Sequence, residues 1–118
     1  AAGAFTWVDS EDLLDPVTAV SGSGPAYVFL LAECLARAGV AAGLDEDLAQ
    51  QLACATVSGS GALLDKTRKT AAQLQRDIAS PGGTTEAALE VLMAEPGMQK
   101  LLTEAVAAAT ARARQLSK

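Results

Sequence analysis

The sequence predicts an all-α fold, and three observations support this class. Alanine and leucine supply 26 and 16 of the 118 residues, whereas valine and isoleucine together supply only nine. Alanine and leucine lose little free energy on entering a helix, while the β-branched and aromatic residues that favour strands are scarce. Apolar residues also recur at helical spacing through most of the chain. A chain of this length is expected to form one domain with a thin core.

The N-terminal residues do not follow the helical pattern. Residues 5–8, Phe-Thr-Trp-Val, form the one convincing strand-like run, and they are too few to make a sheet by themselves. Residues 9–15 form an acidic connector, and Pro-Val-Thr-Ala-Val follows at 16–20. The helical part of the chain is therefore expected to begin after residue 15.

The first long helix is predicted at residues 26–38 and is apolar on nearly every side. Pro25 suits the first turn of a helix, and Gly39 suits the left-handed position that follows its last turn. Only Glu33 and Arg37 interrupt the apolar surface, at a spacing that allows an ion pair. Because a helix without a polar face must be covered on several sides, this helix is expected to be buried.

The second long helix is predicted to start after Asp45 and to continue to about Lys66. Asp45 is a suitable N-cap, and Glu46 and Asp47 place acidic side chains in the first turn, where the helix dipole favours them. Ser-Gly-Ser-Gly at 58–61 falls inside this pattern, where each glycine costs about 1 kcal/mol relative to alanine. Either a close helix crossing compensates for that cost or the helix breaks there.

Three further helices complete the chain. They are predicted at residues 70–79, at residues 86–94 and from Pro96 to about residue 116. Basic residues near the C-terminus suit the negative end of the last helix dipole. They are Arg112, Arg114 and Lys118. The five helices are predicted to form one unit.

The alanine content also has a consequence for assembly. Alanine buries little area, so alanine-rich helices approach closely but gain little free energy at roughly 25 cal/mol per Å². A monomeric bundle of this composition would be under-stabilised, and an obligate dimer with the helices of two chains interleaved would resolve the deficit. We therefore expect a helical bundle that forms an interleaved dimer.

Composition excludes several classes of function. The chain contains no histidine, which removes Ser-His-Asp and Cys-His catalysis and His-ligated zinc, and we expect no metal site. The net charge of -5 argues against the basic surface of a nucleic-acid-binding protein, so no nucleic-acid partner is expected. Acidic residues dominate residues 1–47, which favours a solvated acidic face.

Cysteine usage and hydropathy bear on the cellular compartment. Cys34 and Cys54 lie in apolar helical patterns without CxxC spacing, which predicts buried, reduced thiols in a cytoplasmic protein. Residues 16–32 form the longest uncharged stretch, but Pro, Ser and Gly make it too polar to span a bilayer, so no membrane partner is expected. We expect no signal peptide, and we interpret a chain that opens with Ala1 as a processed or excised piece.

Residues 80–85, Ser-Pro-Gly-Gly-Thr-Thr, are the most informative part of the sequence and are called the 80–85 segment below. The segment lies between two predicted helices, so its backbone N–H groups would face an anion at a helix N-terminus. Its glycines allow close approach, Ser80, Thr84 and Thr85 add hydroxyls, and it contains no carboxylate to repel an anion. A small carboxylate fits this chemistry. The alternative is a plain turn with Thr84 as the N-cap.

Residues 21–25, Ser-Gly-Ser-Gly-Pro, form a second glycine-rich turn onto a helix, called the 21–25 segment below. Gly22 and Gly24 match two glycines of a dinucleotide fingerprint, but Tyr27 stands where the third belongs and no βαβ unit surrounds it. The segment is therefore either a place where a cofactor edge contacts the backbone or only a cap of the next helix. Tyr27 is either a core residue or a proton donor.

The sequence resembles a known family over nearly its whole length, from about residue 5 to residue 116. The resemblance rests on residues 15–29, Glu33, residues 38–40, residues 43–44, residues 78–85 and residues 88–89. These closely resemble the C-terminal part of pyrroline-5-carboxylate reductase. The resemblance implies an enzyme of proline biosynthesis, in which NAD(P)H gives a hydride to the C=N carbon of 1-pyrroline-5-carboxylate and yields L-proline.

The family pairs a Rossmann domain with an all-α domain that forms an interleaved homodimer and often a ring of dimers. By resemblance, residues 1–15 are the remnant strand and acidic connector from the N-terminal cofactor domain. Residues 16–118 are then the all-α dimerisation and substrate-binding domain. Because NADPH or NADH would be bound mainly by the absent domain, the isolated chain is expected to be inactive. The alternative is a non-catalytic helical dimerisation module whose glycine segments only cap helices.

The resemblance also implies roles for residues of both segments. The substrate carboxylate would be held by the Ser80 hydroxyl and the N–H groups of Gly83 and Thr84, with Gly82 in the same binding segment. Thr85 is the implied catalytic residue, with its hydroxyl at the ring nitrogen as a hydrogen-bond donor or a relay from water. The nicotinamide would be bordered by the 21–25 segment. Its implied cofactor-binding residues are Ser21, Gly22, Ser23, Gly24 and Pro25.

Overall fold

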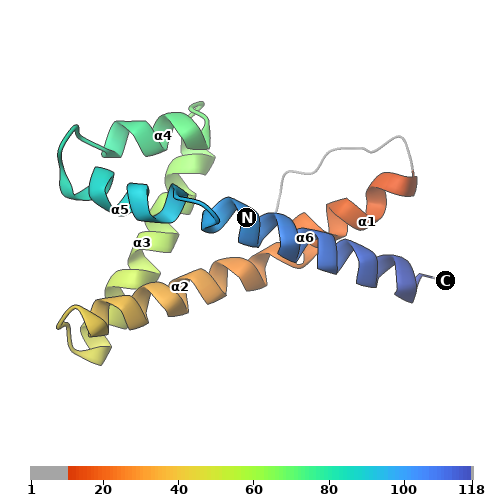
Figure 1. Cartoon of the computed structure of the whole chain (residues 1–118), viewed down its shortest axis with the longest axis horizontal. Coiled ribbons are helices and arrows are strands. Elements are labelled where there is room, and N and C mark those ends of the chain that lie inside the picture. The colour runs from red at the N-terminus through yellow and green to blue at the C-terminus, as the bar shows by residue number, and fades with distance from the viewer. Residues whose placement is uncertain (1–10, 118) are drawn as a thin grey trace. The chain divides into compact units, whose positions relative to one another are not determined.

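The structure, a computed structural model, describes residues 11–117 (Figure 1). Its helices in chain order are η1 (Glu11–Leu13, a 3-10 helix), α1 (Leu14–Val17), η2 (Thr18–Gly22, a π-helix), α2 (Gly24–Ala41), α3 (Glu46–Lys66), α4 (Ala71–Ile78), α5 (Thr84–Met93) and α6 (Gly97–Leu116). No strand occurs among the described residues, and the all-α class is confirmed. The strand-like run at 5–8 lies outside the described residues, and the connector is helical from Glu11 onward.

The helices form two compact units rather than the single predicted one. One unit contains the described residues up to Ala26 together with those from Glu90 onward, and the other spans Tyr27–Leu89. Contacts within this one chain therefore do not join the five predicted helices into one unit. Apolar periodicity shows that a helix has a face to bury, but it does not show which helix covers that face.

In the first unit, α1 and η2 pack against α6. Ala19 in η2 is only 1% exposed, and Thr110 in α6 is buried with its hydroxyl donating to the backbone oxygen of Val106 at 2.7 Å. The Asp15 carboxylate lies 3.7 Å from Nε of Arg114, which stands in the last turn of α6. Arg114 therefore pairs with an acidic residue of α1 and also interacts favourably with the negative C-terminal end of the α6 dipole.

In the second unit, α2 and α3 pack through small side chains near the turn that joins them (Figure 1). Their buried core consists of Ala36, Ala49 and Ala53. A Cβ added at Gly39 would lie 3.4 Å from the Cβ of Ala49, so the two backbones already stand close together. The expectation that small residues let these helices approach closely is confirmed for this pair.

The C-terminus of α2 lies further along the chain than predicted. Gly39 is inside the helix, and the left-handed residue is Gly43, whose φ is +114°. The N–H of Leu44 donates to the oxygen of Gly39 at 3.0 Å, and the N–H of Gly43 donates to the oxygen of Val40 at 2.9 Å. This pair of bonds closes a helix that ends in glycine. The predicted cap was of the right kind but at the wrong glycine, because Gly39 packs against α3 instead.

The N-terminus and length of α3 agree with the prediction. The Asp45 side chain accepts a hydrogen bond from the N–H of Leu48 at 2.9 Å, and the helix continues unbroken to Lys66. The alternative of a break at residues 58–61 is therefore wrong. A close helix crossing is not found there either, because a Cβ added at Gly59 or Gly61 meets no described atom within 4 Å.

The described residues leave most large apolar side chains exposed. Every buried hydrophobic residue among them is an alanine, whereas Phe29 is 70% exposed and Leu101 is 69% exposed. Cys34 and Cys54 are free, as predicted, but they are exposed rather than buried. Their burial was predicted from the apolar character of α2 and α3, and this chain alone does not cover the faces that carry them.

The helical stretch Leu14–Ala41 is 28 residues long, with a mean hydropathy of 1.3 over its most apolar window, of which 11% is buried. Among the described residues it is the one stretch that is long and apolar enough to cross a membrane by length and composition alone. The mean hydropathy does not support the prediction that residues 16–32 are too polar to span a membrane. The glycines and serines lower this mean only slightly, because the leucines and valines raise it more. The core helix of a soluble protein passes the same test.

Candidate functional site

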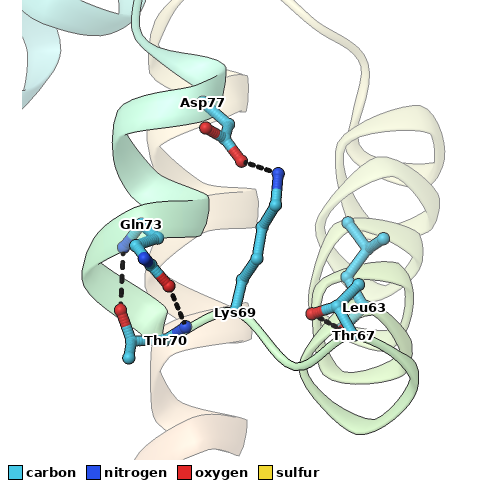
Figure 2. A network of polar contacts seen from close by, with 6 residues as sticks. All are labelled: Leu63, Thr67, Lys69, Thr70, Gln73 and Asp77. Carbon is cyan, nitrogen blue, oxygen red and sulfur yellow. Dashed lines mark hydrogen bonds and ion pairs between the residues drawn. The ribbon is translucent and has the colours of Figure 1, made fainter.

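The candidate site begins with the helix that leads into it. Thr70 caps α4, because its hydroxyl accepts from the N–H of Gln73 at 3.1 Å while its own N–H donates to Oε1 of Gln73 at 2.8 Å (Figure 2). This reciprocal pair satisfies two N–H groups that a helix start leaves open. The prediction of a helix at residues 70–79 is confirmed to within a residue at each end, since α4 spans Ala71–Ile78.

An ion pair joins the two ends of this helical segment. Nζ of Lys69 lies 2.6 Å from Oδ2 of Asp77, reaching along α4 from the residue before its cap (Figure 2). Thr67 ends α3, with both its hydroxyl and its N–H donating to the backbone oxygen of Leu63. Both partners of the ion pair are about half exposed, so the pair contributes only about 0.5 kcal/mol.

The 80–85 segment starts with a tight turn. The N–H of Gly83 donates to the oxygen of Ser80 at 2.9 Å, and Gly82 has a φ of +73°. Proline followed by a glycine of positive φ is the signature of a type II β-turn, and here these positions are Pro81 and Gly82. A Cβ added at Gly83 would stand 3.1 Å from the Ser80 oxygen, so this turn requires both glycines.

Helix α5 begins directly after this turn, two residues earlier than predicted. Thr84 and Thr85 are its first residues, and Gly83 takes the cap position because its oxygen accepts from the N–H of Ala87 at 3.3 Å. The alternative in which Thr84 is the N-cap is therefore wrong. The start predicted at Glu86 was late because the turn after Pro81 needs only Gly82 and Gly83, which leaves both threonines for the helix.

Several hydrogen-bond donors remain open at this helix start. Within the described part of the chain, the N–H groups of Thr84 and Thr85 and the hydroxyls of Ser80, Thr84 and Thr85 have no partner. Ser80 and Thr84 are exposed, and Thr85 is half-buried. The positive end of the α5 dipole adds to these donors. The arrangement suits a small anion, and the structure brings the predicted residues of the 80–85 segment together in one turn and one helix end.

Two other N–H groups of the segment are already used. That of Gly83 closes the turn on Ser80, and that of Gly82 donates to Oε1 of Glu86 at 3.1 Å. The segment itself contains no carboxylate, but the Glu86 carboxylate reaches back to it from the first turn of α5. Its position in that turn, where acidic side chains commonly return to the helix cap, was the signal in the sequence.

The 21–25 segment is helical rather than an open turn. Ser21 and Gly22 belong to the π-helix η2, Ser23 alone interrupts the helix, and Gly24 and Pro25 start α2. The N–H of Ser23 donates to the oxygen five residues earlier at 2.9 Å, which gives the wide turn. The prediction of a glycine-rich turn is corrected in this respect, whereas Pro25 lies in the first turn of α2 as predicted.

The first residue of the 21–25 segment has its polar group bonded within its own helix, whereas the backbone near the end of the segment is open. The hydroxyl of Ser21 donates to the oxygen of Val17 at 2.8 Å and is thus turned toward its own helix. A Cβ added at Gly24 would meet no described atom within 4 Å, so the space beside its Cα is open. Tyr27 is half-buried. The 21–25 segment and the 80–85 segment belong to different compact units.

Comparison with known proteins identifies the family. The profile of a family described as pyrroline-5-carboxylate reductase dimerisation matches residues 11–116. The chain belongs to this pyrroline-5-carboxylate reductase family. The profile covers every helix that the structure describes, including both candidate segments.

Individual pyrroline-5-carboxylate reductases are similar along nearly the whole chain. The Synechocystis sp. protein is 48% identical over 108 residues, which cover 92% of this chain and 40% of that protein. The Coxiella burnetii structure matches with a TM-score of 0.89 at 42% identity and covers 95% of this chain and 41% of its own. The Plasmodium falciparum structure, solved with NADP bound, matches with a TM-score of 0.84 at 36% identity. It covers 92% of this chain and 41% of its own, so this chain spans well under half of the reductases it matches.

Proposed function

We propose that the chain is the dimerisation and substrate-binding part of an enzyme that reduces 1-pyrroline-5-carboxylate to L-proline with NAD(P)H. Membership of the family supports the proposed reaction. The start of α5 at Thr84 supports the proposed binding of a substrate carboxylate by this chain. Open N–H groups and hydroxyls gather there behind a tight turn, as a carboxylate requires. The two free thiols support a cytoplasmic location as part of the same proposal.

The substrate carboxylate is proposed to bind at the start of α5. The N–H of Thr84 and the hydroxyl of Ser80 are its donors, aided by the helix dipole. The resemblance also implies a contact from the N–H of Gly83; because this N–H already donates to the Ser80 oxygen, such a contact would have to be a second, shared hydrogen bond. Backbone N–H donors held in fixed positions bind a carboxylate without help from a protonatable side chain. This mode of binding is compatible with a chain that contains no histidine.

Thr85 is proposed to hold the ring nitrogen of the substrate. Its hydroxyl has no partner in the described part of the chain, and the residue is half-buried one position after the carboxylate donor. A threonine hydroxyl does not ionise near neutral pH, so it donates a hydrogen bond or passes on a proton from water. Orientation of the C=N bond by these two contacts supplies much of the rate.

The 21–25 segment is proposed to border a nicotinamide cofactor, NADPH or NADH. The open backbone at Gly24 and the half-buried Ser23 fit the edge of a flat ring, while the rest of such a cofactor needs residues outside this chain. The nicotinamide supplies the hydride when it is bound. Pro25 and the helical backbone around it would give the ring a rigid edge to lie against.

The chain is proposed to act as a homodimer with interleaved helices, which can assemble further as a ring of dimers. The exposed leucines and valines of the single chain, together with the open surface at Gly59 and Gly61, support this assembly. A second copy that packed on these faces would bury them and would also cover the exposed apolar length of α2.

Titration of this chain with L-proline, followed by NMR, tests the proposal at its substrate-binding part. Chemical-shift changes centred on residues 80–85 are expected, with weak affinity because the cofactor side of the pocket is missing. Their absence at tens of millimolar proline would favour a non-catalytic dimerisation module. The reductase that contains the chain is expected to oxidise NAD(P)H in the presence of 1-pyrroline-5-carboxylate, and the isolated chain is expected not to.

A further inference from the structure

Glu86 makes a contact in the 80–85 segment that its place in the sequence does not require. It is the third residue of α5, and its Oε1 accepts from the N–H of Gly82 at 3.1 Å. In a capping box, an acidic residue at this position accepts from the N–H of the cap residue itself. The cap here is Gly83, whose N–H is already bonded to the Ser80 oxygen. Glu86 therefore reaches one residue further back.

This contact controls the orientation of one peptide plane. The N–H of Gly82 belongs to the peptide that joins it to Pro81, in the middle of the turn. Rotation of that peptide by half a turn interconverts type II and type I turns, and it swings this N–H to the opposite side. An acceptor on the N–H keeps the peptide in the orientation that the φ of +73° at Gly82 records.

We propose that Glu86 is a positioning residue for the substrate carboxylate. The inference rests on the proposed function, since it assumes that the start of α5 binds that carboxylate. Glu86 holds the peptide between Pro81 and Gly82, and with it the turn that joins Ser80 to Thr84, the two residues that supply the proposed carboxylate donors. Glu86 is itself exposed and occupies neither of these donors. Its effect is therefore on substrate binding and not on hydride transfer.

A competing effect has the opposite sign. A carboxylate next to an anion site repels the substrate, so if repulsion were the main effect, removal of Glu86 would tighten substrate binding. Variants that change the length of the side chain at position 86 separately from its charge distinguish positioning of the turn from repulsion of the substrate. Glu86→Gln keeps an acceptor of the same length without the charge, Glu86→Asp keeps the charge with a shorter reach, and Glu86→Ala removes both.

Steady-state kinetics of the reductase that contains this chain provide the test. For Glu86→Ala and Glu86→Asp we expect KM for 1-pyrroline-5-carboxylate to rise about fivefold, the effect of one lost hydrogen bond, with kcat and the cofactor KM within about twofold of wild type. Glu86→Gln is expected to restore the wild-type KM. The matched control is Glu90→Ala, which removes the same charge from the next turn of α5, where its side chain makes no contact with the turn.

Three results would overturn the inference. They are an unchanged or lower KM in Glu86→Ala, a wild-type KM in Glu86→Asp, and a Glu86→Gln variant that behaves like Glu86→Ala. Thermal melting of each variant checks folding, and Glu86→Asp and Glu86→Gln still decide the question if the alanine variant does not fold. A wild-type protein that does not turn over 1-pyrroline-5-carboxylate would contradict the proposed function instead, so the two failures are distinguishable.

Discussion

Gly82 and Gly83 meet different steric demands within one turn. Gly82 adopts a positive φ that an L residue enters only at a cost of about 1–2 kcal/mol. Gly83 has no such dihedral, but any side chain there would press on the Ser80 oxygen. Together they bring the chain from α4 to α5 without using the N–H groups of Thr84 and Thr85, and this is what leaves those groups for a ligand.

Thr85 is the residue whose replacement should separate catalysis from folding. In the full-length reductase, Thr85→Ala is expected to lower kcat by about 10²-fold, because one positioned hydrogen-bond donor at the reacting group is lost. The hydroxyl has no partner within the described residues, so the melting temperature should change little. Thr85→Ser keeps the hydroxyl and is the matched control. Turnover that stays unchanged in Thr85→Ala would refute the proposed role.

Helix starts follow closely from local sequence in this chain. Asp45 and Thr70 both accept from the N–H of the third residue beyond, and α3 and α4 begin immediately after them. Caps of this kind depend on residues at most four positions apart, so they can be predicted from the sequence without knowledge of the fold. The C-terminus of α2 was harder to predict, because Gly39 and Gly43 both satisfy the local pattern and only contact with α3 distinguishes them.

The cap at Asp45 gives a prediction at the level of one helix. Asp45→Ala is expected to lower the free energy of unfolding by about 1 kcal/mol, through loss of the hydrogen bond from the N–H of Leu48. Asp47→Ala is the control, because Asp47 lies in the same first turn without capping it, and its loss should cost about 0.5 kcal/mol. Urea unfolding at one protein concentration measures both. Equal losses for the two variants would contradict the capping role.

The candidate site could be predicted only in part from sequence. The donors at Ser80, Thr84 and Thr85 follow from residue types next to a helix start. The position of Glu86 in the first turn indicates a return to the helix cap, but its bond to Gly82 and the use of the Gly83 N–H within the turn depend on the backbone path between Pro81 and Thr84. Residue types therefore predict an anion site, while the turn geometry decides which N–H groups of this candidate site are available.

At the scale of the whole molecule, the exposed apolar side chains favour association with a second chain. Among the described residues, the first unit buries one alanine and one threonine and the second buries three alanines, while larger apolar side chains along α2 and α6 remain exposed. Burial of such side chains contributes roughly 1.5–3 kcal/mol apiece, whereas alanine contributes much less. Sedimentation of the chain at micromolar concentration is expected to show a dimer. A stable monomer under these conditions would contradict the proposed assembly.

Gly59 provides a graded test of that dimer. No described atom lies near the position of its Cβ, so Gly59→Ala and Gly59→Leu fit the single chain and should stabilise α3 by about 0.5–1 kcal/mol through helix propensity. A partner helix packed against this glycine would oppose the larger side chain. We therefore expect Gly59→Leu to weaken the dimer at least tenfold and Gly59→Ala to weaken it less. An unchanged dissociation constant in Gly59→Leu would place this surface outside the interface.

Alanine excess, caps and glycine placement were enough to derive the all-α class of residues 11–117, the long helices and the starts of α3 and α4, because these depend on neighbours within one or two turns. The division into two compact units, the choice of Gly43 over Gly39 and the exposure of both cysteines were not derivable in this way. They depend on which surfaces meet, and an apolar face carries no information about its partner. The contact of Glu86 spans only four residues, and it depends on the backbone path of one turn rather than on the meeting of two surfaces.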